Sequence, residues 1–131
     1  MEKASQLSIP MENVPGQLGR LCRILTQANV NIRGISISES SDFSTIRVIL
    51  SDPAAARKAL REAGLTFAVQ DVLIAEVTDK PGALECIAQR LGEVGINVQY
   101  VYGVANGTAG HAKLVLHVDD VDRARQALGD L

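Results

Sequence analysis

The sequence predicts an α+β protein made of two copies of one small unit, each ordered strand, helix, strand, strand, helix, strand. The main observation is an internal repeat: Asn13–Leu18 returns as Asp79–Leu84, and Val30–Ile32 returns as Ile96–Val98, both sixty-six residues later. Apolar residues also switch between alternating and helical spacing along each copy, with Pro, Gly and Asn between the segments. Each unit should fold as an antiparallel sheet with both helices on one face.

The two copies are expected to form two domains, 1–70 and 71–131. A domain this small buries only about 60% of the surface that its unfolded chain exposes, so each copy should be stabilised by its twin or by a second chain. The composition, 47% hydrophobic and 21% charged, is that of a globular protein. An aromatic content of 3%, with no Trp, argues against stacking on nucleic-acid bases.

Charge and hydropathy exclude further classes of function. The net charge is -2 and no basic stripe is present that would attract nucleic acid or anionic lipid. Met1–Gln6 lacks the apolar core of a signal peptide, and no apolar run reaches the length of a membrane span. We therefore expect a soluble cytoplasmic protein. Cys22 and Cys86 lack CxxC spacing or a neighbouring His, and we expect both to be small core residues.

The first copy begins with a half-buried strand, because Leu7, Ile9 and Met11 alternate with Gln, Ser and Pro. Pro15 suits the first turn of the following helix, and Asn29 suits its left-handed end. The apolar stripe of this helix recurs every three or four residues, at Leu18, Leu21, Cys22, Leu25 and Ala28.

Two further strands, a helix and a short strand complete the first copy. The second strand places Ile35 and Ile37 on one face. The third strand is expected to direct three residues inward, Ile46, Val48 and Leu50, and three outward, Thr45, Arg47 and Ile49. Asp52–Pro53 should open the second helix as its N-cap and first residue, and Gly64 should end it. Residues 65–69 are expected to form the fourth strand.

The second copy repeats this order, with a first strand at 72–77 and Gly95 in place of Asn29 at the helix end. A turn at 106–110 should join its next two strands. The sixty-six-residue shift carries Ile46, Val48 and Leu50 onto Ala112, Leu114 and Leu116. Asp120 should cap the last helix, before which two residues are inserted relative to the first copy.

The second copy has no segment that corresponds to a fourth strand. Its first strand, 72–77, would therefore have a bare edge, and apolar bare edges are rarely left in water. We expect the first copy or a second chain to cover this edge. This is the main reason to expect a homodimer.

Both copies resemble ACT domains, the small ferredoxin-like ligand-binding modules attached to enzymes of amino-acid metabolism. The family pattern is a first strand, a polar residue ahead of Pro-Gly-x-Leu, a helix, and a segment like Gly-Ile-Asn-Ile before the second strand. The first copy reads Asn13-Val14-Pro15-Gly16-Gln17-Leu18 with Asn29-Val30-Asn31-Ile32, and the second reads Asp79-Lys80-Pro81-Gly82-Ala83-Leu84 with Gly95-Ile96-Asn97-Val98. The resemblance covers nearly the whole chain, and its repetition at a fixed register makes it specific.

This resemblance implies a stand-alone tandem ACT protein that senses an amino acid and acts on a partner. In the family, the loop after the first strand and the start of a neighbour's second strand hold the ligand at a seam between domains. The candidate ligand-binding residues are therefore Asn13, Val14, Pro15, Gly16, Gln17, Leu18, Asn31 and Ile32 in the first copy, and Asp79, Lys80, Gly82, Ala83, Leu84, Asn97 and Val98 in the second. The alternative is a ligand-free regulatory subunit that assembles with an enzyme of amino-acid metabolism.

The loop chemistry suits an amino acid independently of the family. N–H groups at a helix start can bind a carboxylate, and Gly16 and Gly82 let a ligand approach the backbone closely. Asn13 or Asp79 can supply an oxygen to the α-ammonium group. Each residue also has an ordinary interpretation, because Asn and Asp are common N-caps, Gly is common in tight turns, and Asn is common after helices.

The two loops are not equivalent. The first has neutral Asn13 and apolar Val14, whereas the second has Asp79 and Lys80, which could pair with each other. The first loop is similar to the serine-binding version of the family loop, but Met11 stands where that version carries a histidine, so the ligand identity does not carry over. We expect the first loop to be the main site. The sequence has no nucleophile with a base, no metal-ligand set and no nucleotide loop, so we expect no enzyme activity and no cofactor.

Overall fold

The computed structural model describes residues 1–104 and 108–129 of the chain. It has two compact units: the N-terminal unit, Ser5–Gln70, and the C-terminal unit, Asp71–Leu131 together with Met1–Ala4. Both are α+β units of antiparallel strands and helices, which confirms the predicted fold class. Residues 106 and 107 of the predicted turn at 106–110, and residue 105 before it, lie outside the described residues.

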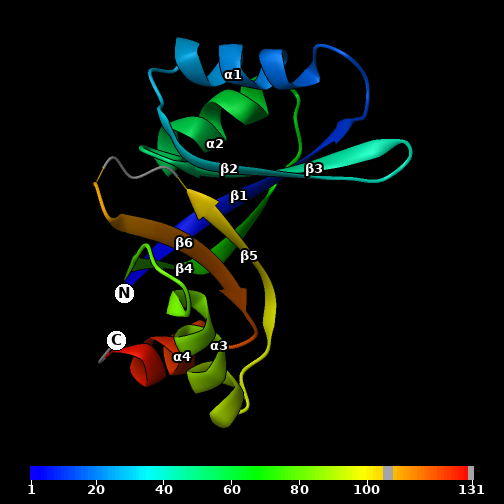
Figure 1. Cartoon of the computed structure of the whole chain (residues 1–131). Helices are drawn as coiled ribbons and strands as arrows, with labels where there is room; N and C mark the ends of the chain where they lie inside the picture. The colour runs from blue at the N-terminus through cyan, green and yellow to red at the C-terminus, as the bar shows by residue number, and fades with distance from the viewer. Residues whose placement is uncertain (105–107, 130–131) are drawn as a thin grey trace. The chain divides into compact units, whose positions relative to one another are not determined.

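The N-terminal unit contains β1 (Glu2–Glu12, from Ser5), α1 (Gln17–Gln27), β2 (Ile32–Glu39), β3 (Phe43–Leu50), α2 (Pro53–Glu62) and the start of β4 (Ala68–Thr78). Its strands lie in the order β2-β3-β1-β4, and both helices cover one face of them (Figure 1). The core lies between that face and the helices, where the predicted inward residues Ile46, Val48 and Leu50 are all buried. Ile49, predicted to face outward, is also buried.

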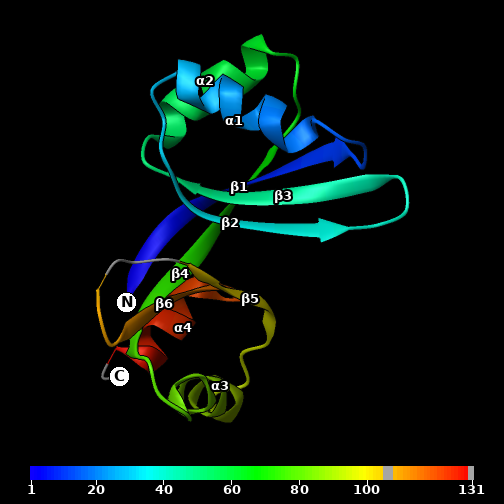
Figure 2. The same ribbon diagram turned by 45° about the horizontal axis from the view of Figure 1, so that its top comes forward.

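The C-terminal unit contains the rest of β4, α3 (Ala83–Glu93), β5 (Val98–Val104), β6 (His111–Val118) and α4 (Val121–Leu128). The strand order within it is β1-β4-β6-β5, with β1 represented by its first residues. Figure 2 shows α3 and α4 on the same side of these strands. Leu73, Ile87 and Leu116 are buried at the centre of its core.

The expected bare edge of the second copy is not bare. Within the C-terminal unit, β1 lies beside β4, and Lys3 forms ion pairs with Asp71 at 3.8 Å and Asp122 at 3.3 Å. The segment Met1–Ala4 thus takes the place of the fourth strand that the second copy lacks. This edge therefore gives no argument for a second chain.

Strand β4 corrects a second expectation. The predicted fourth strand of the first copy and first strand of the second are one continuous strand, which begins at Ala68 rather than at Leu65. Pro15 also lies outside the helix that it was expected to open, because α1 begins at Gln17 with Gly16 as its N-cap. Cys86, expected in the core, is exposed, and Cys22 is half-buried.

The register of the strands shows where the second copy gained two residues. Met11 pairs with Ser44, and its repeat counterpart Val77 pairs with Ala112. Ile37 pairs with Ile46, and its counterpart Gly103 pairs with Leu114. From β3 onward the copies are therefore offset by sixty-eight residues, which makes Leu114, Leu116 and Val118 the counterparts of Ile46, Val48 and Leu50. The insertion lies in the β5–β6 connection and not before the last helix.

Several helix boundaries follow the predicted signals. The side chains of Asp52 and Asp120 accept hydrogen bonds at 3.1 Å from the N–H groups of Ala55 and Arg123, which confirms both as N-caps. Asn29, with φ of 57°, adopts the left-handed conformation predicted after α1. No helix within residues 1–104 and 108–129 has both the length and the apolar character needed to cross a membrane.

Candidate ligand-binding site

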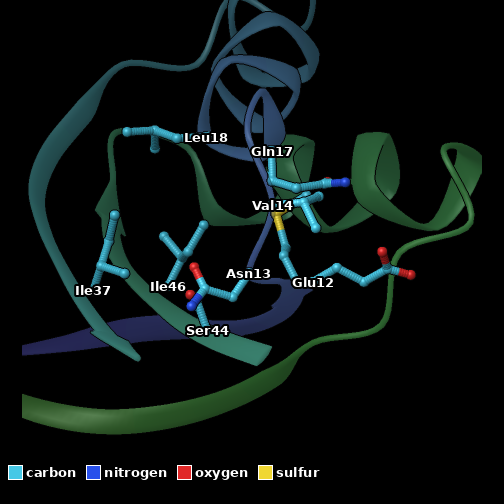
Figure 3. Close-up of a pocket in the computed structure, with 9 residues that line it drawn as sticks. Glu12, Asn13, Val14, Gln17, Leu18, Ile37, Ser44 and Ile46 are labelled. Carbon is cyan, nitrogen blue, oxygen red and sulfur yellow. The ribbon is translucent and has the colours of Figure 1, made fainter. Parts of the chain in front are cut away.

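A pocket of about 160 Å³ lies in the N-terminal unit, where the loop between β1 and α1 meets the ends of β2 and β3 (Figure 3). The pocket combines apolar side chains with a few polar ones. It is lined by Met11, Glu12, Asn13, Val14, Gln17, Leu18, Ile37, Ser44 and Ile46. Four of the predicted ligand-binding residues of the first copy thus meet at one hollow, whereas Pro15 and Gly16 shape the loop without lining it.

The start of α1 leaves hydrogen-bond donors unused beside this pocket. Gly16 takes a left-handed conformation with φ of 92°, and no side chain caps the helix. Within the described part of the chain, the N–H groups of Gln17, Leu18 and Gly19 have no hydrogen-bond acceptor. The helix dipole adds a partial positive charge at the same point, so a carboxylate would be stabilised there.

Asn13 is not the N-cap of α1, because Gly16 holds that position. The interpretation of Asn13 as an ordinary helix cap is therefore wrong. Its Nδ2 atom donates to the carbonyl oxygen of Ser40 at 3.3 Å and to Oε2 of Glu39 at 3.5 Å, and its backbone N–H donates to the carbonyl oxygen of Asp42 at 2.9 Å. These bonds fix the side chain against the β2–β3 hairpin. They leave Oδ1 as an acceptor that no group in the described residues uses.

Ser44 is a polar residue of the pocket that sequence reasoning missed. Only 9% of its surface is exposed, and its hydroxyl has no hydrogen-bond partner among the residues that the structure describes. It lies two positions before Ile46, so it shares the helix-facing side of β3. That alternation was a usable signal, because a Ser at an inward position of a strand requires a partner when it is buried.

Most of the remaining lining residues are apolar, with Glu12 and Gln17 as the exceptions. Met11 and Ile46 are buried at its base, and Val14, Leu18 and Ile37 are partly exposed around its rim. In Figure 3 Ile46 lies next to Asn13 and Ser44, Leu18 and Ile37 lie farther to the left, and the carboxylate of Glu12 points away to the right. The pocket therefore presents polar groups at one side and hydrocarbon on the others.

The second loop has the same backbone but different surroundings. Gly82 has φ of 89° and no side chain caps α3, although the N–H of Ala83 donates to the carbonyl oxygen of Lys80 at 3.4 Å. The pocket residues of the first copy change at the equivalent positions of the second: Asn13 to Asp79, Val14 to Lys80, Gln17 to Ala83, Ile37 to Gly103 and Ser44 to Ala112. The two predicted sites are thus chemically distinct.

The structure does not bring the residues predicted at the start of the second strands to these loops. The backbone N–H of Asn31 donates to Oγ of Ser51 at 2.8 Å, and its carbonyl accepts from the N–H of Ser51 at 2.9 Å. Ile32 packs on the core at the end of β2 remote from Ile37, about 16 Å away along the strand. In the second copy Val98 begins β5 in the same way, and the carbonyl of Asn97, just before it, accepts from the N–H of Asp119 at 3.3 Å. A contact between these residues and a loop of another domain remains a prediction.

Comparison with known proteins gives a consistent result. A family model described as an ACT domain pair matches residues 2–129. The crystal structure of protein BT0572 from Bacteroides thetaiotaomicron is 32% identical and matches 98% of this chain and 88% of its own, with a TM-score of 0.91. No curated protein sequence matches the chain.

More distant structures share the fold alone. The regulatory subunit of aspartate kinase from Thermus thermophilus, in its ligand-free form, is 12% identical and matches 98% of this chain and 96% of its own, with a TM-score of 0.66. The regulatory subunit of aspartate kinase from Thermus flavus is 15% identical and matches 98% of this chain and 92% of its own, with a TM-score of 0.67.

Proposed function

The chain belongs to the ACT domain pair family, and on that premise we propose that it is a non-catalytic regulatory protein that binds an amino acid. The observation that carries the proposal is the pocket at the start of α1. Unused N–H donors and the unused oxygen of Asn13 border the same small hollow. A ligand with a carboxylate and an ammonium group satisfies both sets of groups at once.

The proposed arrangement of the ligand follows from charge. The carboxylate lies at the N-terminus of α1, where the N–H groups of Gln17 and Leu18 and the helix dipole stabilise it. The ammonium group donates to Oδ1 of Asn13. The side chain then meets the apolar part of the pocket, formed by residues such as Ile37 and Ile46. Neither a plain anion nor a plain cation would use both ends of the site.

We further propose that a partner protein reads the bound state. Asn13 links the loop before α1 to the β2–β3 hairpin through its hydrogen bond to the carbonyl of Ser40. A ligand that also binds Asn13 therefore acts on both segments. A ligand that binds one arrangement of these segments better shifts the population toward it. The distant structural relatives are regulatory subunits of aspartate kinase, and we propose that an enzyme of amino-acid metabolism is likewise the class of partner here.

We also propose that the chain forms homodimers through the edge of the N-terminal unit. β2 is the outer strand of that unit, and Ile35 on it is exposed. An apolar strand with an unpaired edge is a template for pairing with another chain. Analytical ultracentrifugation is expected to give twice the 14.0 kDa mass of one chain, and Ile35→Lys is expected to shift the species to monomer. A wild-type protein that stays monomeric at high concentration would contradict this proposal.

A thermal-shift screen of the full chain against the twenty amino acids tests amino-acid binding. At a ligand concentration about 100 times Kd, binding stabilises the folded state by about 2.7 kcal/mol, which raises Tm by roughly 5–15 °C. The rise should be selective and should grow with ligand concentration. If no amino acid raises Tm, but a stable complex with an enzyme of amino-acid metabolism is isolated, the chain is instead a ligand-free regulatory subunit.

A further inference from the structure

We propose that the pocket of the N-terminal unit is specific for an amino acid with a compact aliphatic side chain, in the class of valine, leucine and isoleucine, and that Ser44 is its second polar anchor. This inference rests on the proposed function and names its ligand class. It is carried by three features of the pocket: its apolar walls, its volume and the unused hydroxyl at its base.

The walls discriminate by polarity. The ligand side chain would lie among Leu18, Ile37 and Ile46, which offer it no hydrogen bond or counter-charge. The carboxylate of Glu12 points away, and that of Glu39 already accepts from Asn13 at 3.5 Å. A lysine or aspartate side chain would lose hydration there without compensation, which is costly for a charged group. An aliphatic side chain gains free energy by leaving water.

The volume discriminates by size. At about 160 Å³, the pocket is comparable to the ~150 Å³ apolar cavity that binds benzene in another protein. The part of a ligand that this partly open pocket can enclose is therefore about six to nine non-hydrogen atoms. Valine, leucine and isoleucine fall within this range, whereas tryptophan and tyrosine exceed it.

Ser44 supplies the observation that points to a ligand independently of the helix start. The residue is 9% exposed and lines the pocket, and its hydroxyl has no hydrogen-bond partner in the described part of the chain. The hydroxyl oxygen is not itself fully buried, so it is accessible from the pocket. A ligand that pairs with this pocket-facing hydroxyl gains a fixed hydrogen bond in place of one to water, and is stabilised by it. With the carboxylate at α1, the group within its reach is the ammonium, which Ser44 would share with Oδ1 of Asn13.

The second copy lacks these features at the equivalent positions. Ala112 replaces the hydroxyl of Ser44, and Gly103 replaces the wall that Ile37 forms. Among the described residues, a Cβ atom built on Gly103 would meet no atom within 4 Å, so none of them fills the space of the missing side chain there. Lys80 in place of Val14 adds a charge at the rim. The inference therefore includes one aliphatic ligand per chain, bound in the N-terminal unit.

Isothermal titration calorimetry of the full chain tests the specificity. Valine, leucine or isoleucine is expected to bind at least ~10-fold more tightly than serine, aspartate, lysine or tryptophan, with one site per chain. If a charged, hydroxylated or large aromatic amino acid binds most tightly, the proposed aliphatic specificity is wrong, but the proposal that the protein binds an amino acid is supported. If none of the twenty binds, the proposed function fails as well.

Two pairs of variants locate the site. Leu18→Ala is expected to weaken aliphatic binding by roughly 10-fold, whereas Leu84→Ala leaves it unchanged. Leu18 and Leu84 occupy equivalent helix positions and are 42% and 43% exposed, so any loss of stability should be equal. Ser44→Ala should weaken binding by roughly fivefold. Ser44→Thr keeps the hydroxyl and should therefore bind more tightly than Ser44→Ala. Equal losses in Leu18→Ala and Leu84→Ala, at unchanged Tm of the free protein, would overturn the assignment.

Discussion

Replacing Asn13 by Ala is expected to weaken amino-acid binding by roughly 10- to 100-fold, because the ammonium group loses a charge-assisted hydrogen bond worth about 1.5–3 kcal/mol. The same change removes the two hydrogen bonds from Nδ2 that hold the loop to Ser40 and Glu39. Titration calorimetry of the variant with the best ligand measures the loss. The stability of the free protein should change little, since Asn13 is exposed.

The matched control for this prediction is Asp79→Ala in the second loop. Asp79 occupies the equivalent position, but its surroundings carry Gly103 and Ala112 instead of Ile37 and Ser44. We expect this variant to bind with the affinity of the unmodified protein. A loss as large as that of Asn13→Ala would place ligand in both loops and contradict the single-site assignment.

Asn13→Asp separates the two roles of the amide. The carboxylate still accepts from the ammonium group, but it cannot donate to Ser40 and it faces the carboxylate of Glu39, which lies 3.5 Å from Nδ2 in the structure. Like charges at that distance repel, so the loop should move away from the hairpin. An affinity between those of the unmodified protein and Asn13→Ala is the expected result.

The loop residues of the site could be predicted because their chemistry is local. A Gly that permits the left-handed turn, N–H groups at a helix start and a polar residue before them are contiguous in sequence, and the repeat shows them twice. The walls could not be predicted in the same way. Ile37 and Ser44 lie in the pocket because β2 and β3 form a hairpin. The register of that hairpin decides which of its side chains lie next to the loop. That register is a tertiary property.

The misplaced insertion has a physical cause in strand geometry. Side chains alternate between the faces of a strand with a period of two, so an offset of sixty-six and one of sixty-eight place the same face of β6 inward. The apolar pattern of Ala112, Leu114 and Leu116 therefore fits both alignments. The cross-strand pairings separate them, because Val77 pairs with Ala112 where Met11 pairs with Ser44, and Gly103 pairs with Leu114 where Ile37 pairs with Ile46. This difference matters for function, because it assigns Ala112 and not Gly110 as the counterpart of Ser44.

The two glycines of the α1 start are expected to respond to Ala with opposite signs. Gly16 has φ of 92°, where an L-residue is strained, so Gly16→Ala should lower the free energy of unfolding by about 1–2 kcal/mol. Gly19 lies within α1, and a Cβ there meets no atom of the described residues within 4 Å. Gly19→Ala should therefore raise the free energy of unfolding by about 0.5–1 kcal/mol, because Ala has the higher helix propensity. Urea denaturation followed by circular dichroism measures both changes, provided that the m-value stays constant.

Ligand binding should separate the same two variants. Gly16→Ala forces the loop away from the conformation that aims the N–H groups of Gln17 and Leu18 at the pocket, so affinity should fall with stability. Gly19→Ala leaves that loop unchanged and should keep full affinity. In the second copy, Gly82→Ala and Gly92→Ala should show the same opposite effects on stability, because Gly82 has φ of 89° and Gly92, although not the counterpart of Gly19, lies within α3. Neither should alter binding. If Gly82→Ala weakens binding as much as Gly16→Ala does, the left-handed turn of the first copy is not what builds the site.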